Sequence, residues 1–259
     1  MKIHVVLAAA LLTVGSVFAD SLPSVWPMPT PPKAPDGTNS AAYPKPQGGA
    51  NWRQWVLGKF NRARSSKAEI QLIFDGDSIT CWWQNAGNKV WIERYARLNA
   101  FDFGMCSDRT ENVLWRLSQG QVQGINPKLI AIMIGTNNIG NTDDVKLAEG
   151  IKAVVMDYQK RCPNAVILLQ GILPSGEKPT DPKRLHIKAV NGMISRLGDG
   201  KKVIYLDFGD KFLSPDGTLS KDVTPDFLHP TEKGYVIWAN AISPIIEKFF
   251  GGAATTPAS

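Results

Sequence analysis

The sequence is poor in the residues that build metal sites and disulfide frameworks, since only three of its 259 residues are cysteine and three are histidine. The cysteines, Cys81, Cys106 and Cys162, form no CxxC pair and no His/Cys ligand spacing. This argues against a structural zinc site. If the protein is exported from the cytoplasm, as its first residues suggest (see below), one disulfide can form, and Cys81 and Cys106 are the pair to test. The alternative is that both stay free thiols, a common state of buried cysteine.

Long apolar runs are missing after the N-terminus. Residues 1–19 combine one lysine, an apolar stretch from Val5 to Leu12, and Val17 and Ala19 three and one residues before a cleavage point. This pattern predicts a cleaved signal peptide and a secreted or periplasmic protein. A membrane anchor is the alternative, but the stretch is shorter than the roughly 20 residues that span a bilayer. We therefore expect no membrane insertion after cleavage.

A strong excess of one charge is also missing. Without Lys2, 28 Lys and Arg face 23 Asp and Glu, which leaves a net charge of +5 and no long basic run. A basic face that binds nucleic acid is therefore not expected, and the charges are typical of an ordinary soluble surface.

Composition divides the chain into three parts after the leader. Residues 20–50 are rich in Pro, Gly, Ser and Ala and predict an extended arm or linker. Residues 51–250 are long enough to bury one substantial core, and residues 251–259 predict a disordered tail. Trp26, Trp52 and Trp55 could hold parts of the arm against the domain.

Short apolar runs alternate with longer amphipathic segments in the central part, as in parallel strands joined by helices. We expect one α/β domain, a three-layer α/β/α fold with a five-stranded parallel sheet and flavodoxin-like topology. The expected strands are 70–75, 100–103, 128–134, 165–170 and 203–207, and the expected helices are 79–97 with a break near Gly87, 109–118, 144–161, 183–198 and 231–249.

Chemically active residue types follow these strands. Ser78 opens a helix after the first strand, and Asp226 and His229 lie in the loop before the last helix. A serine hydroxyl needs an imidazole to accept its proton and a carboxylate to orient that imidazole. His4 lies in the leader and His186 in a basic helical segment, so elimination selects His229.

Acyl transfer also requires donors that stabilise an oxyanion. The candidates are the backbone N–H of Ser78, at a helix start where amides lack partners, the backbone of Gly104 and the side chain of Asn137. Each has a structural alternative: Asp77 and Ser78 as helix caps, Gly104 as a tight turn, and Asn137 as a turn residue.

In order, GDSIT (76–80), NAFDFGMCSDRT (99–110), IGTNN (134–138) and DFLHP (226–230) resemble the four blocks of the SGNH or GDSL hydrolase family. Within it the chain looks most like the catalytic subunits of platelet-activating factor acetylhydrolase and their secreted bacterial relatives. The resemblance implies that Ser78 is the nucleophile, His229 the base, Asp226 its partner, and Gly104 and Asn137 oxyanion donors. The resemblance also implies no metal, and we expect no other cofactor. The chain departs from the family at Cys106 and Ser107, where relatives commonly have two glycines.

These features predict an exported serine esterase that hydrolyses small acyl esters, above all acetyl esters on carbohydrate. A lysophospholipase, arylesterase or thioesterase on the same site, a carbohydrate-binding protein without turnover and an interaction protein that acts through its arm are the alternatives. Trp82, Trp83 and Trp91 could line the acyl or leaving-group site, or pack in the core. The expected partner is a small-molecule or polysaccharide ester, and the resemblance leaves room for a homodimer.

Overall fold

The computed structural model describes residues 33–251, which contain one parallel sheet of five strands in the order β2-β1-β3-β4-β5. Every adjacent pair of strands is parallel. The order changes direction at β1, where successive connections run to opposite edges of the sheet, and such a switch point is where ligands bind in open α/β sheets. The strands are β1 (Leu72–Gly76), β2 (Ala100–Asp102), β3 (Leu129–Met133), β4 (Val166–Gln170) and β5 (Val203–Leu206).

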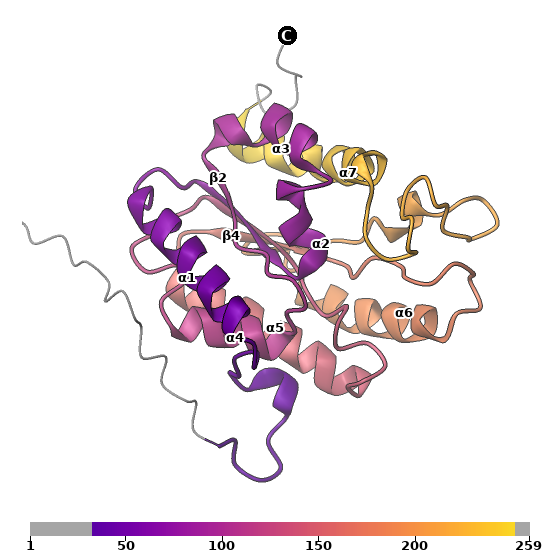
Figure 1. The fold of residues 1–259 in the computed structure, drawn as a ribbon, viewed down its shortest axis with the longest axis horizontal. Helices are drawn as coiled ribbons and strands as arrows, with labels where there is room; N and C mark the ends of the chain where they lie inside the picture. The colour runs from indigo at the N-terminus through magenta and orange to yellow at the C-terminus, as the bar shows by residue number, and fades with distance from the viewer. Residues whose placement is uncertain (1–32, 252–259) are drawn as a thin grey trace, which may run out of the picture. The chain divides into compact units, whose positions relative to one another are not determined.

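Helices cover both faces of this sheet. Figure 1 shows α3 and α7 together on one side and α4, α5 and α6 on the other, which makes three layers. The α-helices are α1 (Ala50–Ser65), α2 (Ser78–Cys81), α3 (Asn88–Arg94), α4 (Thr110–Ser118), α5 (Asp144–Arg161), α6 (Pro182–Ile194) and α7 (Glu232–Phe250), and the 3-10 turns are η1 (Ser40–Ala42), η2 (Trp82–Gln84), η3 (Ala96–Leu98), η4 (Ser195–Leu197) and η5 (Gly209–Phe212).

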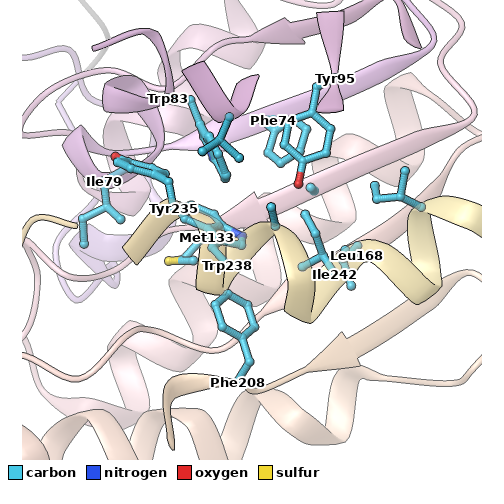
Figure 2. Packing of buried hydrophobic residues seen from close by; sticks show 14 of the residues in the cluster. Phe74, Ile79, Trp83, Tyr95, Met133, Leu168, Phe208, Tyr235, Trp238 and Ile242 are labelled. Carbon is cyan, nitrogen blue, oxygen red and sulfur yellow. The ribbon is translucent and has the colours of Figure 1, made fainter. Parts of the chain in front are cut away.

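The core between the sheet and α7 is aromatic. Trp83 lies with its ring centroid 4.4 Å from that of Tyr235 and 4.9 Å from that of Trp238, and Phe74 of β1 packs 4.9 Å from Tyr95. Figure 2 shows these side chains directed toward one another between the strands and α7. Buried aromatic pairs of this kind stabilise a core beyond the area they bury, so the loops at the strand ends rest on a rigid base.

The predicted fold class is confirmed, and all five expected strands and all five expected helical regions are present with small shifts at their ends. The break near Gly87 separates η2 from α3. A Cβ at Gly87 would lie 2.8 Å from the Tyr235 ring, so the chain changes direction where it touches the core.

Helix α1 is absent from the predicted elements. Its buried residues Trp52, Val56, Lys59, Phe60 and Ala63 follow helical spacing. Its start, however, carries no side-chain cap and no acidic residue, and Gly58 lies in its middle. The usual signals for a helix boundary are therefore weak.

The described part of the arm, residues 33–49, lies against the domain and is not a free linker. The hydroxyl of Thr110 donates to the carbonyl of Ala41 at 2.7 Å, the side chain of Asn112 donates to the carbonyl of Lys45 at 2.8 Å, and the side chain of Asn39 bonds to α5. This segment therefore straps α4 to α5. The predicted signal peptide, Trp26 and the predicted tail beyond Gly251 lie outside the described residues.

Candidate active site

Ser78 stands at the first position of α2, directly after β1. Gly76 makes this geometry possible, because a Cβ there would lie 2.1 Å from the carbonyl oxygen of Met133 and 2.4 Å from the hydroxyl of Thr80. Oδ1 of Asp77 caps the helix by accepting the N–H of Ile79 at 3.0 Å, and not that of Ser78. The N–H of Ser78 thus points out of an N-terminal turn beside its own hydroxyl.

The loop before α7 brings an imidazole to this hydroxyl. Nε2 of His229 lies 2.9 Å from Oγ of Ser78, and Nδ1 of His229 lies 2.6 Å from Oδ2 of Asp226. A carboxylate only accepts hydrogen bonds, so Nδ1 carries the proton and Nε2 is free to accept one from Ser78. Three side chains that lie far apart in the sequence therefore form one hydrogen-bonded chain.

The same loop is held in a strained turn. Oδ1 of Asp226 accepts the backbone N–H of Leu228 at 3.1 Å and of His229 at 2.8 Å, while Phe227 adopts a φ of 58°. A residue other than glycine at positive φ costs about 1–3 kcal/mol. Partial burial works against ionisation of Asp226, but its hydrogen bonds from His229 lower its pKa below the ordinary value. The turn thus presents an ionised carboxylate to the imidazole.

The ring of Trp82 covers one face of the His229 imidazole. Its ring is stacked on His229, with centroids 4.3 Å apart and planes 20° apart. Trp82 lies four residues after Ser78 in the helical segment formed by α2 and η2, which brings the two side chains to the same face. Trp83 and Trp91 are buried in the core, so of the three tryptophans expected to line the site or the core, Trp82 faces the site.

Gly104 lies at the predicted place, after β2, but its polar groups are already used. Its N–H donates to Oδ1 of Asp102 at 2.7 Å, and its carbonyl accepts from Nζ of Lys59 at 2.6 Å. A Cβ at Gly104 would lie 2.5 Å from the backbone nitrogen of Cys81. The prediction that its N–H is an oxyanion donor is therefore not supported, and its role is to let the turn pack against α2.

Ser107 offers another backbone N–H in the same turn. The turn closes through the N–H of Asp108 and the carbonyl of Met105 at 3.1 Å, with Ser107 exposed at a φ of 63°. The carbonyl of Asp108 accepts from Nδ2 of Asn137 at 2.9 Å, so Ser107 precedes a residue that touches the predicted asparagine. A glycine adopts positive φ readily, so the departure from two glycines at 106–107 is the sequence signal that could have drawn attention to this position.

Asn137 lies in a turn, as its structural alternative expected, and its role as an oxyanion donor stays a prediction. The loop after β3 folds as a turn through the N–H of Asn138 and the carbonyl of Gly135 at 2.9 Å. The side chain of Asn137 uses one of its amide hydrogens on Asp108 and retains a second one. It is partly exposed, whereas Asn138 is buried and bonds to Thr110. Asn137 can therefore donate toward a ligand while it positions the turn that carries Ser107.

The sequence profile of the GDSL-like lipase/acylhydrolase family matches residues 74–237, which contain every residue of this site. The chain belongs to this family. The family is one of carboxylic ester hydrolases, so the protein is an enzyme that acts on an ester.

Relatives and solved structures agree with this assignment. The platelet-activating factor acetylhydrolase IB subunit alpha1 of Bos taurus is 32% identical over 213 residues, which cover 80% of this chain and 89% of the relative. A GDSL-like lipase structure from Bacteroides thetaiotaomicron superposes with a TM-score of 0.62 at 21% identity over 77% of this chain and 98% of the other. An acetyl xylan esterase gives 0.57 at 20% identity over 68% and 100%. These structures share the fold.

A buried network of charges connects two of the segments that carry the candidate active site of this GDSL acylhydrolase. The guanidinium of Arg116 bonds to Asp75 at 2.8 Å and to Asp108 at 2.7 Å, and all three side chains are buried. Burial raises the pKa of Asp108 to about 6, although Arg116, Gln47 and Trp52 stabilise its charge. The network joins the end of β1 to the Ser107 turn through α4, so these two parts of the site are positioned by one cation.

Two thiols lie beside the esterase site. Cys81 and Cys106 are both free and hydrogen-bonded to each other, and the bond from Cys81 lowers the pKa of Cys106 to about 6. Cys162 is buried and also free. Residues 33–251 contain no group of three or more His, Cys, Asp or Glu able to hold a metal ion, and no helix among them is sufficiently long and apolar to cross a bilayer.

Proposed function

We propose that this protein is an exported serine esterase that removes small acyl groups, above all acetyl, from the oxygen of a carbohydrate, with Ser78 as nucleophile. The observation that carries the proposal is the hydrogen-bonded chain from Oγ of Ser78 through both nitrogens of His229 to Oδ2 of Asp226, with links of 2.9 Å and 2.6 Å. Each member has the partner that nucleophilic catalysis requires.

In the proposed mechanism, Nε2 of His229 takes the proton of Ser78 while Oγ attacks the ester carbonyl. The carbonyl oxygen becomes an oxyanion, held by the backbone N–H of Ser78, the backbone N–H of Ser107 and the side-chain amide of Asn137. Ser107 replaces Gly104 in this set, because the N–H of Gly104 donates to Asp102.

Collapse of the tetrahedral intermediate breaks the bond to the alcohol, which leaves with the proton from His229. Water then loses a proton to His229 and attacks the acyl-serine, and the second collapse returns the proton to Oγ of Ser78 and frees the carboxylic acid. Asp226 stabilises the imidazolium in both steps, and its lowered pKa keeps it ionised for this role.

The acyl preference rests on the relative at 32% identity, whose name is acetylhydrolase. The carbohydrate preference rests on the leader-like residues 1–19, which favour substrates outside the cytoplasm. A lysophospholipase, arylesterase or thioesterase would use the same residues and differs in the ester it accepts.

The decisive experiment compares wild type, Ser78→Ala and Ser195→Ala on p-nitrophenyl acetate, butyrate and octanoate and on acetylated xylan. Ser195 lies outside the site, where its hydroxyl bonds to the carbonyl of Gly192. We expect Ser78→Ala to lose at least about 1,000-fold in kcat, as other enzymes do without their nucleophile, and Ser195→Ala to keep wild-type rates. Equal rates for Ser78→Ala and wild type would refute the mechanism, and preference for octanoate would refute the small-acyl assignment.

Export has its own test. Expression of the full chain in a bacterial host, followed by N-terminal sequencing of the protein released from the periplasm or medium, should give a chain that starts at Asp20, directly after the predicted cleavage point. An intact N-terminus confined to the cytoplasm would contradict export.

A further inference from the structure

A pocket of about 430 Å³ opens beside the active site, between α1 and the segment formed by η2 and the Ser107 turn. Trp82 connects it to the reaction centre, because this ring lines the pocket and also stacks on His229. Cys106, the neighbour of Ser107, lines it as well. The pocket and the imidazole of His229 therefore both contact the ring of Trp82.

The volume exceeds what an acetyl group needs. Pockets for small molecules usually enclose about 300–1,000 Å³, so this one has room for a moiety of the size of a sugar unit or larger. An esterase for small acyl groups has to accommodate its alcohol outside the acyl site, and this pocket adjoins the reaction centre through Trp82.

The lining residues combine aromatic faces with planar polar groups. Trp55 of α1 is 57% exposed and lines the pocket together with Trp82. Gln54, Gln84 and Asn85 contribute side-chain amides. Aromatic rings stack on the apolar C–H faces of sugar rings, and amides both donate to and accept from hydroxyl groups.

The charged groups that line the pocket suit an uncharged alcohol. No Asp or Glu among the described residues lines the pocket, its cations are Lys59 and Arg62, and Cys106, whose pKa is lowered to about 6, adds a thiolate at neutral pH. The ammonium of Lys59 is occupied by the carboxylate of Asp102 at 3.2 Å and by backbone carbonyls. Arg62 and the Cys106 thiolate give the pocket one charge of each sign and no net excess, which suits a neutral sugar.

Gly58 keeps the α1 wall open. It lies mid-helix, where glycine costs about 1 kcal/mol relative to alanine. Its missing side chain leaves the space between Trp55 and Arg62 empty. A Cβ there would meet Nη1 of Arg62 at 3.5 Å, an ordinary contact, and the backbone has no positive φ. A larger residue at this position would therefore fill the pocket without a clash in the backbone.

We propose that this pocket binds the alcohol part of the ester, that its ligand is a neutral carbohydrate chain, and that Trp55 is the ring on which a sugar unit stacks. The proposal rests on the proposed esterase function and names the substrate class for the same site.

The test uses Gly58→Leu, which fills the pocket, and Trp55→Ala, which removes the stacking surface. Matched controls on α6 are Gly192→Leu, where an added Cβ meets nothing within 4 Å, and Leu185→Ala, whose side chain is 73% exposed. Kinetics are measured on acetylated xylo-oligosaccharides, acetylated manno-oligosaccharides, p-nitrophenyl acetate and p-nitrophenyl octanoate.

We expect both pocket variants to raise KM for the better oligosaccharide about tenfold, the loss of about 1.4 kcal/mol of binding, with kcat within twofold of wild type. The ratio of kcat/KM for oligosaccharide to that for p-nitrophenyl acetate should fall about tenfold, and both controls should keep the wild-type ratio. An unchanged ratio in Gly58→Leu would overturn the proposal, as would a selective loss of octanoate hydrolysis, which would identify an acyl pocket.

Failure of this inference can be distinguished from failure of the esterase proposal. If wild type hydrolyses p-nitrophenyl acetate and Ser78→Ala does not, while neither oligosaccharide is a substrate, the esterase stands and the carbohydrate pocket is wrong. If no ester is hydrolysed, calorimetric binding of the unacetylated oligosaccharides to wild type and Gly58→Leu still decides the pocket: loss in Gly58→Leu supports it, and equal or absent binding overturns it.

Discussion

Asp77, next to the proposed nucleophile, should make the stability of the protein fall as pH rises. The side chain is 1% exposed, Oδ1 accepts the N–H of Ile79, and Oδ2 has no hydrogen-bond partner among the described residues. Burial raises the pKa of Asp77 from 3.8 to about 7, and the nearby charges of Asp108 and Cys106 add to the effect. The folded protein thus holds a proton at Asp77 that the unfolded chain releases above pH 4.

The sign and size follow from proton linkage. Between pH 4 and 7 the folded state binds more protons than the unfolded state, so the free energy of unfolding decreases as pH rises through this window. At about 1.4 kcal/mol per pH unit, the loss between pH 4.5 and 8.5 is about 3 kcal/mol. Asn cannot ionise and keeps the oxygen that caps α2, so Asp77→Asn should lack this loss.

Urea unfolding at pH 4.5 and 8.5, followed by tryptophan fluorescence, measures the effect. The stability of Asp77→Asn relative to wild type should rise by about 3 kcal/mol between the two pH values, whatever constant cost the new amide carries. Asp222→Asn, whose parent side chain is 79% exposed, is the control and should follow wild type within about 0.5 kcal/mol, as surface changes do. Parallel pH dependence of Asp77→Asn and wild type would refute a buried, protonated Asp77.

Three other positions give sharp expectations. Arg116→Met should lower the free energy of unfolding, measured with urea, by about 3–5 kcal/mol, because two buried carboxylates lose their cation. The control Arg161→Met breaks a partly exposed pair and should cost under about 1 kcal/mol. Similar losses of stability in the two variants would contradict the role of the buried network. Gly104→Ala should destabilise the protein by more than about 1 kcal/mol, since the added Cβ would lie 2.5 Å from the backbone nitrogen of Cys81. Gly192→Ala, where the added Cβ meets nothing within 4 Å, should stabilise the protein by up to about 1 kcal/mol. Unchanged stability in both variants would exclude the tight contact at Gly104. Iodoacetamide should alkylate Cys106 at a rate that rises through pH 6 and is level by pH 8, in line with its lowered pKa, and a rise centred near pH 8.5 would rule out thiolate stabilisation by its neighbour.

The sheet and most helices were predictable because their signals are local. Each buried strand is a short apolar run between turn residues, and the helix over 144–161 was predicted at the bounds it has in the structure. Helix α1 escaped prediction because it lacks a side-chain cap and an acidic first turn. Its place against β2 depends on a long-range pair, Lys59 with Asp102, which no local pattern contains.

The site divides in the same way. Residue types and their order pointed to Ser78, His229, Asp226 and Asn137, because acyl transfer needs those groups and parallel strands deliver their loops to one edge. The choice between Gly104 and Ser107 was out of reach of the sequence, since it depends on which backbone N–H is consumed by Asp102 and which residue adopts a positive φ.

By itself the sequence determined the fold class, the family and the four side chains of the proposed chemistry, since hydrophobic spacing and motif order are properties of the chain. Only the tertiary structure decided which backbone groups remain available, that Trp82 stacks on the imidazole, and that α1 and η2 enclose a pocket beside it. Those features arise where segments distant in sequence meet, and there packing and hydrogen-bond competition determine which groups a substrate can reach.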